Sequence, residues 1–162
     1  AGWEGAVYDQ NISYSESTTP STIFSSNFSI SGGNALLTAD ADNNWSVELF
    51  QNFQINSITV GNSLSLSLGL ASVLTSVDDF VHAQLIVGAD SLDVTAGGIF
   101  DVTAWQGEMA TLSFLIEDDD FLAFDTLEIS DISFTENQAT VPEPTTLLLI
   151  GAGLMAMRRK VS

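Results

Sequence analysis

The chain has 162 residues, enough for one domain of ordinary size, with 21 acidic residues against 3 basic ones and no cysteine. The basic residues, Arg158, Arg159 and Lys160, all lie in the last five positions. Residues 1–157 therefore cannot neutralise phosphates, which excludes nucleic acid as a partner and excludes docking of this part on an anionic membrane. A hydrophobic content of 45% still predicts a folded body, stabilised by apolar burial, hydrogen bonds and bound metal rather than by ion pairs.

The N-terminal stretch, residues 1–26, is polar and rich in Ser and Thr. Because the chain starts at Ala1, we interpret this as a mature N-terminus left by cleavage of a signal peptide. The stretch suits either an ordinary edge strand or an arm that adds to the sheet of a neighbouring copy. The sequence leaves both alternatives open.

Segments that alternate apolar and polar residues follow one another along the body. The clearest is 63–70, which places Leu64, Leu66, Leu68 and Leu70 on one face and serines on the other. Further strands are predicted at 6–14, 22–30, 45–50, 53–60, 83–87, 99–104, 109–116 and 126–134. Turn signals rich in Gly, Asn and Asp lie at 32–34, 42–44, 61–62, 97–98 and 117–120. This pattern predicts an all-β fold, an antiparallel β-sandwich or jelly roll over residues 1–137, followed by a short C-terminal hydrophobic helix.

Two segments depart from simple alternation. In 126–134 the apolar parity changes between Ile129 and Ile132, which predicts a β-bulge near Ser130–Asp131. In 70–81 the apolar residues recur at helical spacing, although their β-branched neighbours fit a strand as well.

The composition changes abruptly after residue 137. Residues 138–144 form a linker that ends in Pro-Glu-Pro, and residues 145–162 form an apolar segment with a basic end. As a helix, Thr145–Met157 would extend about 20 Å, against about 30 Å for a bilayer core. The basic end fits the positive-inside rule and predicts a C-terminus in the cytoplasm.

This tail resembles the PEP-CTERM sorting signal of Gram-negative bacterial exported proteins. The matching residues are Val141, Pro142, Glu143 and Pro144, then the apolar segment 145–154, then Arg158, Arg159 and Lys160. The resemblance covers about the last 22 residues. It implies export by a cleaved signal peptide, recognition of the tail by the membrane protease exosortase, and a place outside the cell or on its outer surface, often with biofilm polysaccharide. It also implies a β-sandwich ectodomain whose last strand leads into the tail. Residues 1–137 resemble no family that we recognise.

The tail contains apolar and small residues that favour helix packing: Leu147, Leu148, Ile150, Gly151, Ala152, Gly153 and Ala156. The small residues permit close helix contact, for example in the core of an assembly, but such residues are also simply common in membrane helices. Residues 151–156 match a dinucleotide-binding pattern, but the chain ends nine residues after Gly153, so this match is spurious.

Two acidic clusters offer oxygen ligands for Ca²⁺. The first contains Asp40, Asp42 and Asn44, and the second contains Glu117, Asp118, Asp119 and Asp120. The first is not an EF-hand, because Trp45 and Gln51 stand where Gly and Glu are needed. The alternative interpretation is solvated acidic and Asx turns.

The sequence offers little for catalysis. His82 is the only histidine, no nucleophile elbow accompanies it, and we interpret it as structural. A carboxylate pair for glycoside hydrolysis remains a distant alternative. The aromatic residues Trp3, Trp45, Trp105, Tyr8 and Tyr14 suit either stacking on sugars or core packing.

These observations together predict a non-enzymatic, exported structural protein. We expect copies of it to self-assemble into a filament, sheath or matrix, with the tail anchored or buried in the assembly. The alternative function is a surface-anchored module that binds extracellular polysaccharide.

Overall fold

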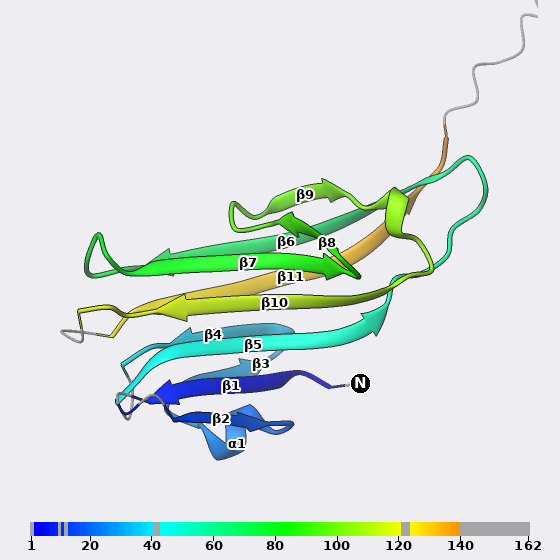
Figure 1. The fold of residues 1–162 in the computed structure, drawn as a ribbon. Helices are drawn as coiled ribbons and strands as arrows, with labels where there is room; N and C mark the ends of the chain where they lie inside the picture. Colours follow the sequence, from blue (N-terminus) through cyan, green and yellow to red (C-terminus); the bar gives the residue numbers. More distant parts are fainter. Residues whose placement is uncertain (1, 10, 12, 41–42, 121–123, 140–162) are drawn as a thin grey trace, which may run out of the picture.

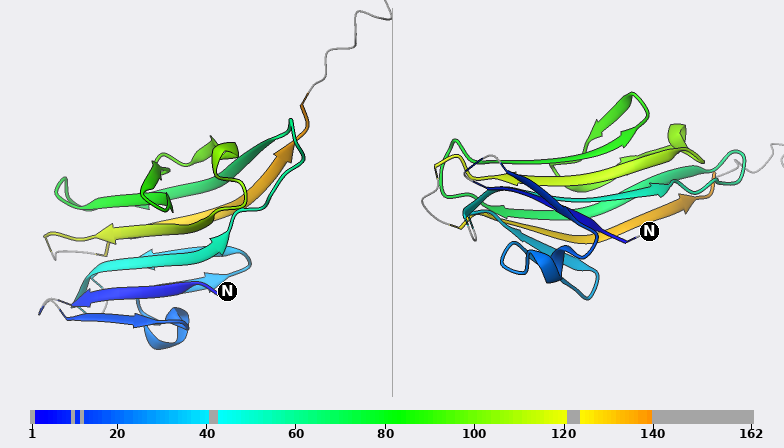
Figure 2. Two further views of the ribbon diagram at one scale, coloured as in Figure 1. Left: turned by 45° about the vertical axis from the view of Figure 1, so that its right-hand side comes forward. Right: turned by 60° about the horizontal axis from the view of Figure 1, so that its bottom comes forward.

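The computed structural model describes residues 2–9, 11, 13–40, 43–120 and 124–139, and it has two antiparallel sheets stacked face to face (Figures 1 and 2). The first sheet, in the order β2-β1-β5-β10-β7-β8, consists of β1 (Glu4–Asp9), β2 (Tyr14–Ser17), β5 (Asn44–Gln54), β7 (Phe80–Val87), β8 (Asp90–Asp93) and β10 (Met109–Glu117). The second sheet, in the order β3-β4-β11-β6-β9, consists of β3 (Phe28–Ser31), β4 (Asn34–Thr38), β6 (Ser63–Val73), β9 (Gly98–Asp101) and β11 (Thr126–Asn137). The prediction of an all-β sandwich is confirmed.

The core lies between the two sheets and contains the alternating residues that the sequence marks. Leu64, Leu66 and Leu68 of β6 are buried, and so are Leu112 and Phe114 of β10. Each fully buried side chain of this size contributes about 1.5–3 kcal/mol. Because residues 1–157 hold no Lys or Arg, this burial and the strand hydrogen bonds carry the stability.

The N-terminal part differs from the strand prediction. Residues 6–14 are not one strand, because Asp9 Oδ1 accepts hydrogen bonds from the N–H groups of Asn11 and Ser13 (both 2.9 Å) and turns the chain from β1 into β2. Residues 22–30 divide into the short helix α1 (Pro20–Ile23) and β3, since Pro20 favours the first turn of a helix. Both strands of the hairpin pair within the chain, as in the ordinary-strand alternative for this stretch.

Other boundaries are also corrected. The strand predicted at 45–50 and the first two residues of the one predicted at 53–60 form a single strand, β5, because Leu49, Gln51 and Phe53 keep one parity while pairing with β10. Residues 55–60 are not a strand, so the rest of that prediction is wrong. The strand predicted at 99–104 ends at Asp101 and is followed by the 3₁₀ helix η2 (Thr103–Trp105). The short strands β4 and β8 were not predicted from the sequence.

The two departures from alternation have clear outcomes. The bulge near Ser130–Asp131 is confirmed, because the register of β11 against β6 shifts between Ser130 and Ser133 and Asp131 has a φ of 54°. This bulge keeps Ile132 and Phe134 on the core side of β11. In 70–81 the chain continues as strand β6 to Val73, so the helical alternative is wrong.

Two copies of the tripeptide Asp-Val-Thr, residues 93–95 and 101–103, close one side of the sandwich. Val94 and Val102 are fully buried, and each donates its N–H to a core strand, to the carbonyl of Ala83 in β7 and of Leu64 in β6 respectively (both 2.9 Å). The Thr hydroxyls accept the N–H groups of the same two strand residues, at 2.9 and 2.8 Å. Between the copies the chain crosses from edge strand β8 to edge strand β9, while on the opposite side β2, α1 and β3 make the other crossing (Figure 1).

The aspartates of both copies predict an acid-sensitive contribution to stability. Hydrogen bonds from the hydroxyl and N–H of Thr95 lower the pKa of Asp93, and those of Thr103 lower the pKa of Asp101. A lowered pKa in the folded state stabilises the fold above the unfolded value of 3.8, and this stability is lost as the pH falls through the folded value. We expect Asp93→Asn/Asp101→Asn to be less stable than the wild type in urea at pH 7, with a difference that closes as the pH falls through the lowered pKa values of the two carboxyls.

The matched control is Asp78→Asn/Asp90→Asn, which removes two charges from exposed positions and should show no such closing gap. A stability difference for Asp93→Asn/Asp101→Asn that stays constant from pH 7 to pH 2 would contradict this role of the two carboxylates.

Candidate metal centre

Three aspartates converge inside one end of the sandwich. Asp79 is 5% exposed, and Asp118 and Asp125 are fully buried. One carboxylate oxygen from each lies within 4.8 Å of the other two. Asp79 directly precedes β7, Asp118 directly follows β10 and Asp125 directly precedes β11, so the cluster lies where these strands meet at the left of Figure 1.

Backbone N–H groups of the surrounding loops hold the three carboxylates in place. Asp79 accepts the N–H of Ser76 (2.6 Å) and of Asp119 (3.0 Å), one on each oxygen. Asp118 Oδ1 accepts the N–H of Asp120 at 3.1 Å, and Asp125 Oδ1 accepts the N–H of Thr75 at 2.8 Å. The loop before β7 and the loop between β10 and β11 are thus tied together through carboxylates.

One oxygen of this cluster has no hydrogen-bond donor. Asp125 Oδ2 is buried and accepts no hydrogen bond, although a buried carboxylate oxygen without a donor loses its hydration at a large cost. Residues 1–157 contain no Lys or Arg that could pair with it. His82 does not help either, since it lies on the opposite face of β7 from buried Ala83, and its charge acts on Asp93.

The pKa values of Asp125 and Asp79 shift in opposite directions. Burial raises the pKa of Asp125, and the neighbouring Asp79 carboxylate raises it further. Burial acts on Asp79 in the same direction, but the N–H groups of Asp119 and Ser76 outweigh it and lower the pKa of Asp79. Without a cation, Asp125 therefore holds a proton more readily than Asp79.

The second predicted acidic cluster contributes only one of its four carboxylates to this centre. Asp118 joins it, while Asp119 is exposed and Asp119 and Asp120 take part through their backbone N–H groups. Glu117 accepts the Ser46 hydroxyl at 3.3 Å, and partial burial raises its pKa.

The first predicted acidic cluster lies in the neighbouring loop between β4 and β5. Asn44 donates its side-chain amide to Asn27 Oδ1 at 3.0 Å, and Asp40 donates its N–H to the Asn44 carbonyl at 2.7 Å. Asp42 lies outside the described residues. The described part of this cluster does not join the three aspartates.

Sequence reasoning missed Asp79 because it lies far along the chain from the run of acids at 117–120, and it missed Asp125 because this single acid stands outside the run, five residues after Asp120. A signal was present: Asp125 directly precedes the predicted strand 126–134, and Asp79 precedes an apolar segment that becomes β7. Placing both at the same end of the sandwich as Asp118 required the strand directions, which the sequence did not supply.

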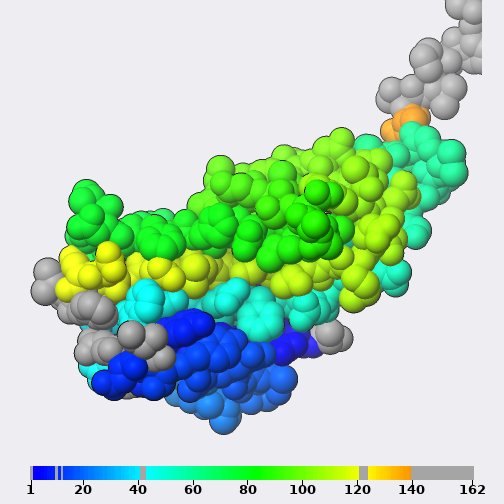
Figure 3. All heavy atoms as spheres, in the orientation of Figure 1, coloured from blue at the N-terminus to red at the C-terminus, as the bar shows by residue number. Residues whose placement is uncertain are grey.

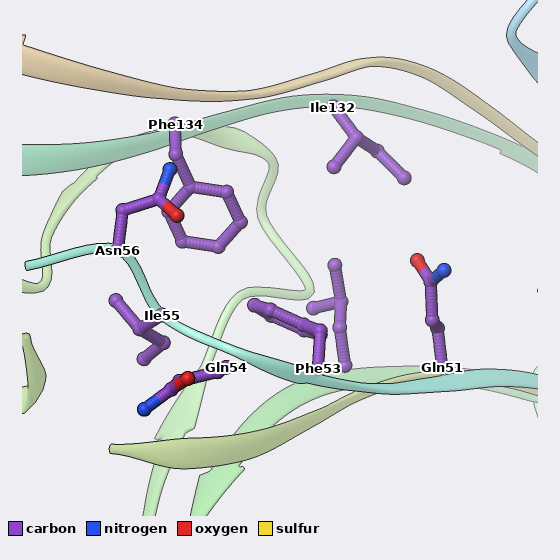
Figure 4. Close-up of a pocket in the computed structure, with 8 residues that line it drawn as sticks. Gln51, Phe53, Gln54, Ile55, Asn56, Ile132 and Phe134 are labelled. Carbon is purple, nitrogen blue, oxygen red and sulfur yellow. The ribbon is translucent and has the colours of Figure 1, made fainter. Parts of the chain in front are cut away.

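A cavity of about 300 Å³ opens between the sheets at β5 and β11 (Figure 4). Phe53 and Phe134 face each other across it with ring centroids 5.4 Å apart, beside Ile132. The full lining is Gln51, Phe53, Gln54, Ile55, Asn56, Leu112, Ile132 and Phe134. Because these side chains are apolar or amides, the cavity has no group of its own for acid–base chemistry.

The candidate sugar-stacking aromatics divide into two groups. Tyr8, Tyr14 and Trp45 form a cluster, with ring centroids 4.9 Å apart for Tyr8–Tyr14 and 6.2 Å apart for Tyr8–Trp45. Trp3 and Trp105 instead pack against the core.

The tail begins at the end of the sandwich opposite the three aspartates. β11 starts beside Asp125 and runs the length of the sandwich to Asn137, and the N–H of Ala139 then donates to Asn62 Oδ1 at 3.2 Å (Figure 1). Among the residues that the structure describes, none belongs to a helix with the length and apolar character needed to span a membrane. The predicted linker end, sorting residues and helix-packing residues from 140 onward lie outside the described part.

Comparison with known families identifies the tail. Residues 140–160 match the PEP-CTERM protein-sorting motif, which includes Val141–Pro144 and Arg158–Lys160. The motif indicates an exported protein that is targeted to the cell envelope or surface, with exosortase-related processing and membrane association through the tail. Comparison with curated proteins gives no match for this sequence.

The motif generates a localisation prediction. We expect deletion of residues 140–160 in the producing cells to move the protein from the envelope fraction to the medium, because these residues carry the sorting motif. Fractionation and immunoblotting measure this, with Val60→Ser, an exposed substitution on the sandwich, as the control. Retention of the deleted chain in the envelope would contradict the prediction.

Proposed function

Because residues 140–160 carry the sorting motif, we propose that this chain is a non-enzymatic structural subunit, exported through a signal peptide from a Gram-negative cell, whose copies assemble on the outer surface or in the surrounding matrix. The observation that carries the proposal is the path of β11. This strand of 12 residues connects the tail at one end of the sandwich to the aspartate cluster at the other. A sandwich attached at its tail end presents the opposite end to its surroundings.

The opposite end exposes apolar side chains, which form a surface that we call the distal tip: Val73, Leu74, Val77, Phe80 and Phe124. Val77 is 97% exposed and Phe124 is 64% exposed. Figure 3 shows the loop that carries Val77 projecting in green at the left of the molecule, above the yellow end of β10. Exposed apolar groups of this kind mark interaction surfaces, and a second copy of the chain is the partner that we propose.

The edges of the sheets favour the distal tip over strand pairing as the assembly contact. All four edge strands, β2, β3, β8 and β9, have only 4 residues, whereas β5, β6 and β11 have 11 or 12. Short edge strands limit edge-to-edge pairing between sheets. Assembly through the ends of the sandwich is therefore the better supported route.

The distal tip can be tested by charge insertion. We expect Val77→Glu/Phe124→Ser to abolish ordered assembly of the full-length chain, because it places a further carboxylate in an apolar contact of a protein with net charge −18. Electron microscopy and sedimentation velocity measure the assemblies.

The control is Val60→Glu, which adds the same charge at a fully exposed position in the loop between β5 and β6, near the tail. If the distal-tip variant assembles normally, or if Val60→Glu loses ordered assembly to the same extent, the distal tip is not the assembly contact.

A second candidate function, binding of extracellular polysaccharide, is favoured by the aromatic cluster. Tyr14 is 49% exposed and its ring lies against that of Tyr8, tilted by 51°, so that aromatic surface is open to a sugar. The Tyr14 hydroxyl donates to Glu16 Oε2 at 2.8 Å, and burial together with this bond raises the pKa of Tyr14 to about 12. The hydroxyl thus stays protonated and oriented at neutral pH.

Glycan-array binding tests this second candidate. If the cluster binds sugars, Tyr14→Ala should raise the Kd by about tenfold or more, because it removes an exposed ring. Tyr14→Phe, which keeps the ring and removes only the hydroxyl, should retain most of the affinity. An unchanged Kd for Tyr14→Ala would exclude this cluster as a sugar site.

A further inference from the structure

We propose that Asp79, Asp118 and Asp125 form a binding site for one Ca²⁺ ion, which fastens the distal end of the two sheets together. The site is assembled from loops 46 residues apart in the sequence, and it does not depend on the proposed assembly function.

The first argument is the chemistry of the ligands. The three residues offer carboxylate oxygens within 4.8 Å of one another, and neither cysteine nor histidine takes part. Oxygen-only sites suit hard cations, and Ca²⁺ accepts the flexible, loop-built geometry more readily than Mg²⁺, which demands a near-ideal octahedron. Three carboxylates supplied by two loops are therefore a better match for Ca²⁺.

A carboxylate oxygen of Asp125 has no hydrogen-bond donor, which also points to a cation. Asp125 is fully buried, and its Oδ2 accepts no hydrogen bond although Oδ1 accepts the N–H of Thr75 at 2.8 Å. Buried polar atoms in folded proteins nearly always have a partner. A cation beside the three carboxylates supplies one, and no side chain of residues 1–157 other than His82 can carry a positive charge.

The third argument is the position of the ligands in the fold. Asp79 and Asp118 adjoin β7 and β10 of the first sheet, whereas Asp125 adjoins β11 of the second. Two backbone bonds draw further strands to the same place: Ala39, after β4, donates to the Asp125 carbonyl (2.9 Å), and Asp118 donates to the Trp45 carbonyl of β5 (2.8 Å). A bound ion thus connects the two sheets at an end where like charges would otherwise push the loops apart.

Location outside the cell strengthens the choice of ion. Extracellular modules commonly bind Ca²⁺ with dissociation constants of about 10⁻⁴–10⁻³ M. An exported protein of this kind would complete the site only after leaving the cytoplasm. The apolar residues of the distal tip, which lie on the same loops or at the strand ends beside them, would become fixed at that point.

Thermal unfolding of the full-length chain in detergent tests the proposal. Free Ca²⁺ at about 100 times its dissociation constant should raise the Tm by about 5–10 °C above the value measured in EDTA. The ionic strength is matched with NaCl, because a chain of net charge −18 gains stability from screening alone. Equilibrium dialysis against Ca²⁺ should show one site that Mg²⁺ competes for only weakly.

Two variants isolate the site. Asp125→Asn and Asp118→Asn should each lose the Ca²⁺-dependent rise in Tm, and Asp125→Asn should unfold in EDTA at the same or a higher temperature than the wild type, since it removes a buried charge without changing shape. Asp78→Asn is the matched control: it removes the neighbouring, exposed carboxylate of the same loop and should keep the full response.

The outcomes separate the alternatives. No response to Ca²⁺ beyond that to NaCl, or a response that persists in both site variants, overturns the proposal. Stabilisation by Asp125→Asn without Ca²⁺ binding by the wild type also overturns it, and indicates instead a proton shared between Asp79 and Asp125. A failure of self-assembly alone leaves the Ca²⁺ response intact, so the two proposals fail independently.

Discussion

The packing of this sandwich depends on carboxylates that have no positively charged side chain to meet. Residues 1–157 contain no Lys or Arg, so within this part of the chain hydrogen-bond donors must take the place of basic side chains at buried acids. Asp93 and Asp101 use the hydroxyl and N–H of a threonine two residues later. The three aspartates at the distal end use backbone N–H groups, yet Asp125 Oδ2 is left without a donor. The same constraint therefore shapes one side of the sandwich and one of its ends.

The sides and the ends of the sandwich expose different groups. At the sides, chain crossings join the two sheets, and the edge strands beside them have 4 residues each, which leaves little backbone for pairing with another molecule. One end of the sandwich leads into the tail, and the other contains both the acidic cluster and the exposed apolar side chains of the distal tip. This arrangement supports our proposal that contacts with other copies form at the ends of the sandwich.

Strand β11 links these features through its bulge. A regular strand would turn either Leu127 and Ile129 or Ile132 and Phe134 away from the core, because side chains alternate between faces. The extra residue at Asp131, with its φ of 54°, keeps both pairs inward. The strand can then extend from the buried Asp125 to the start of the tail while still covering the core.

Local patterns in the sequence were enough to predict the sandwich, the bulge and the sorting motif, because alternation, parity and a tail of fixed order are short-range signals. They were not enough for the hairpin of β1 and β2, where a turn formed by Asp9 overrode the alternation. Only the tertiary structure brought Asp79 and Asp125 to Asp118. Asp118 and Asp125 lie at the two ends of the loop between β10 and β11, whereas Asp79 comes from the loop before β7. Their meeting depends on strand order and direction, which are set by the packing of two whole sheets and leave no mark in any one segment.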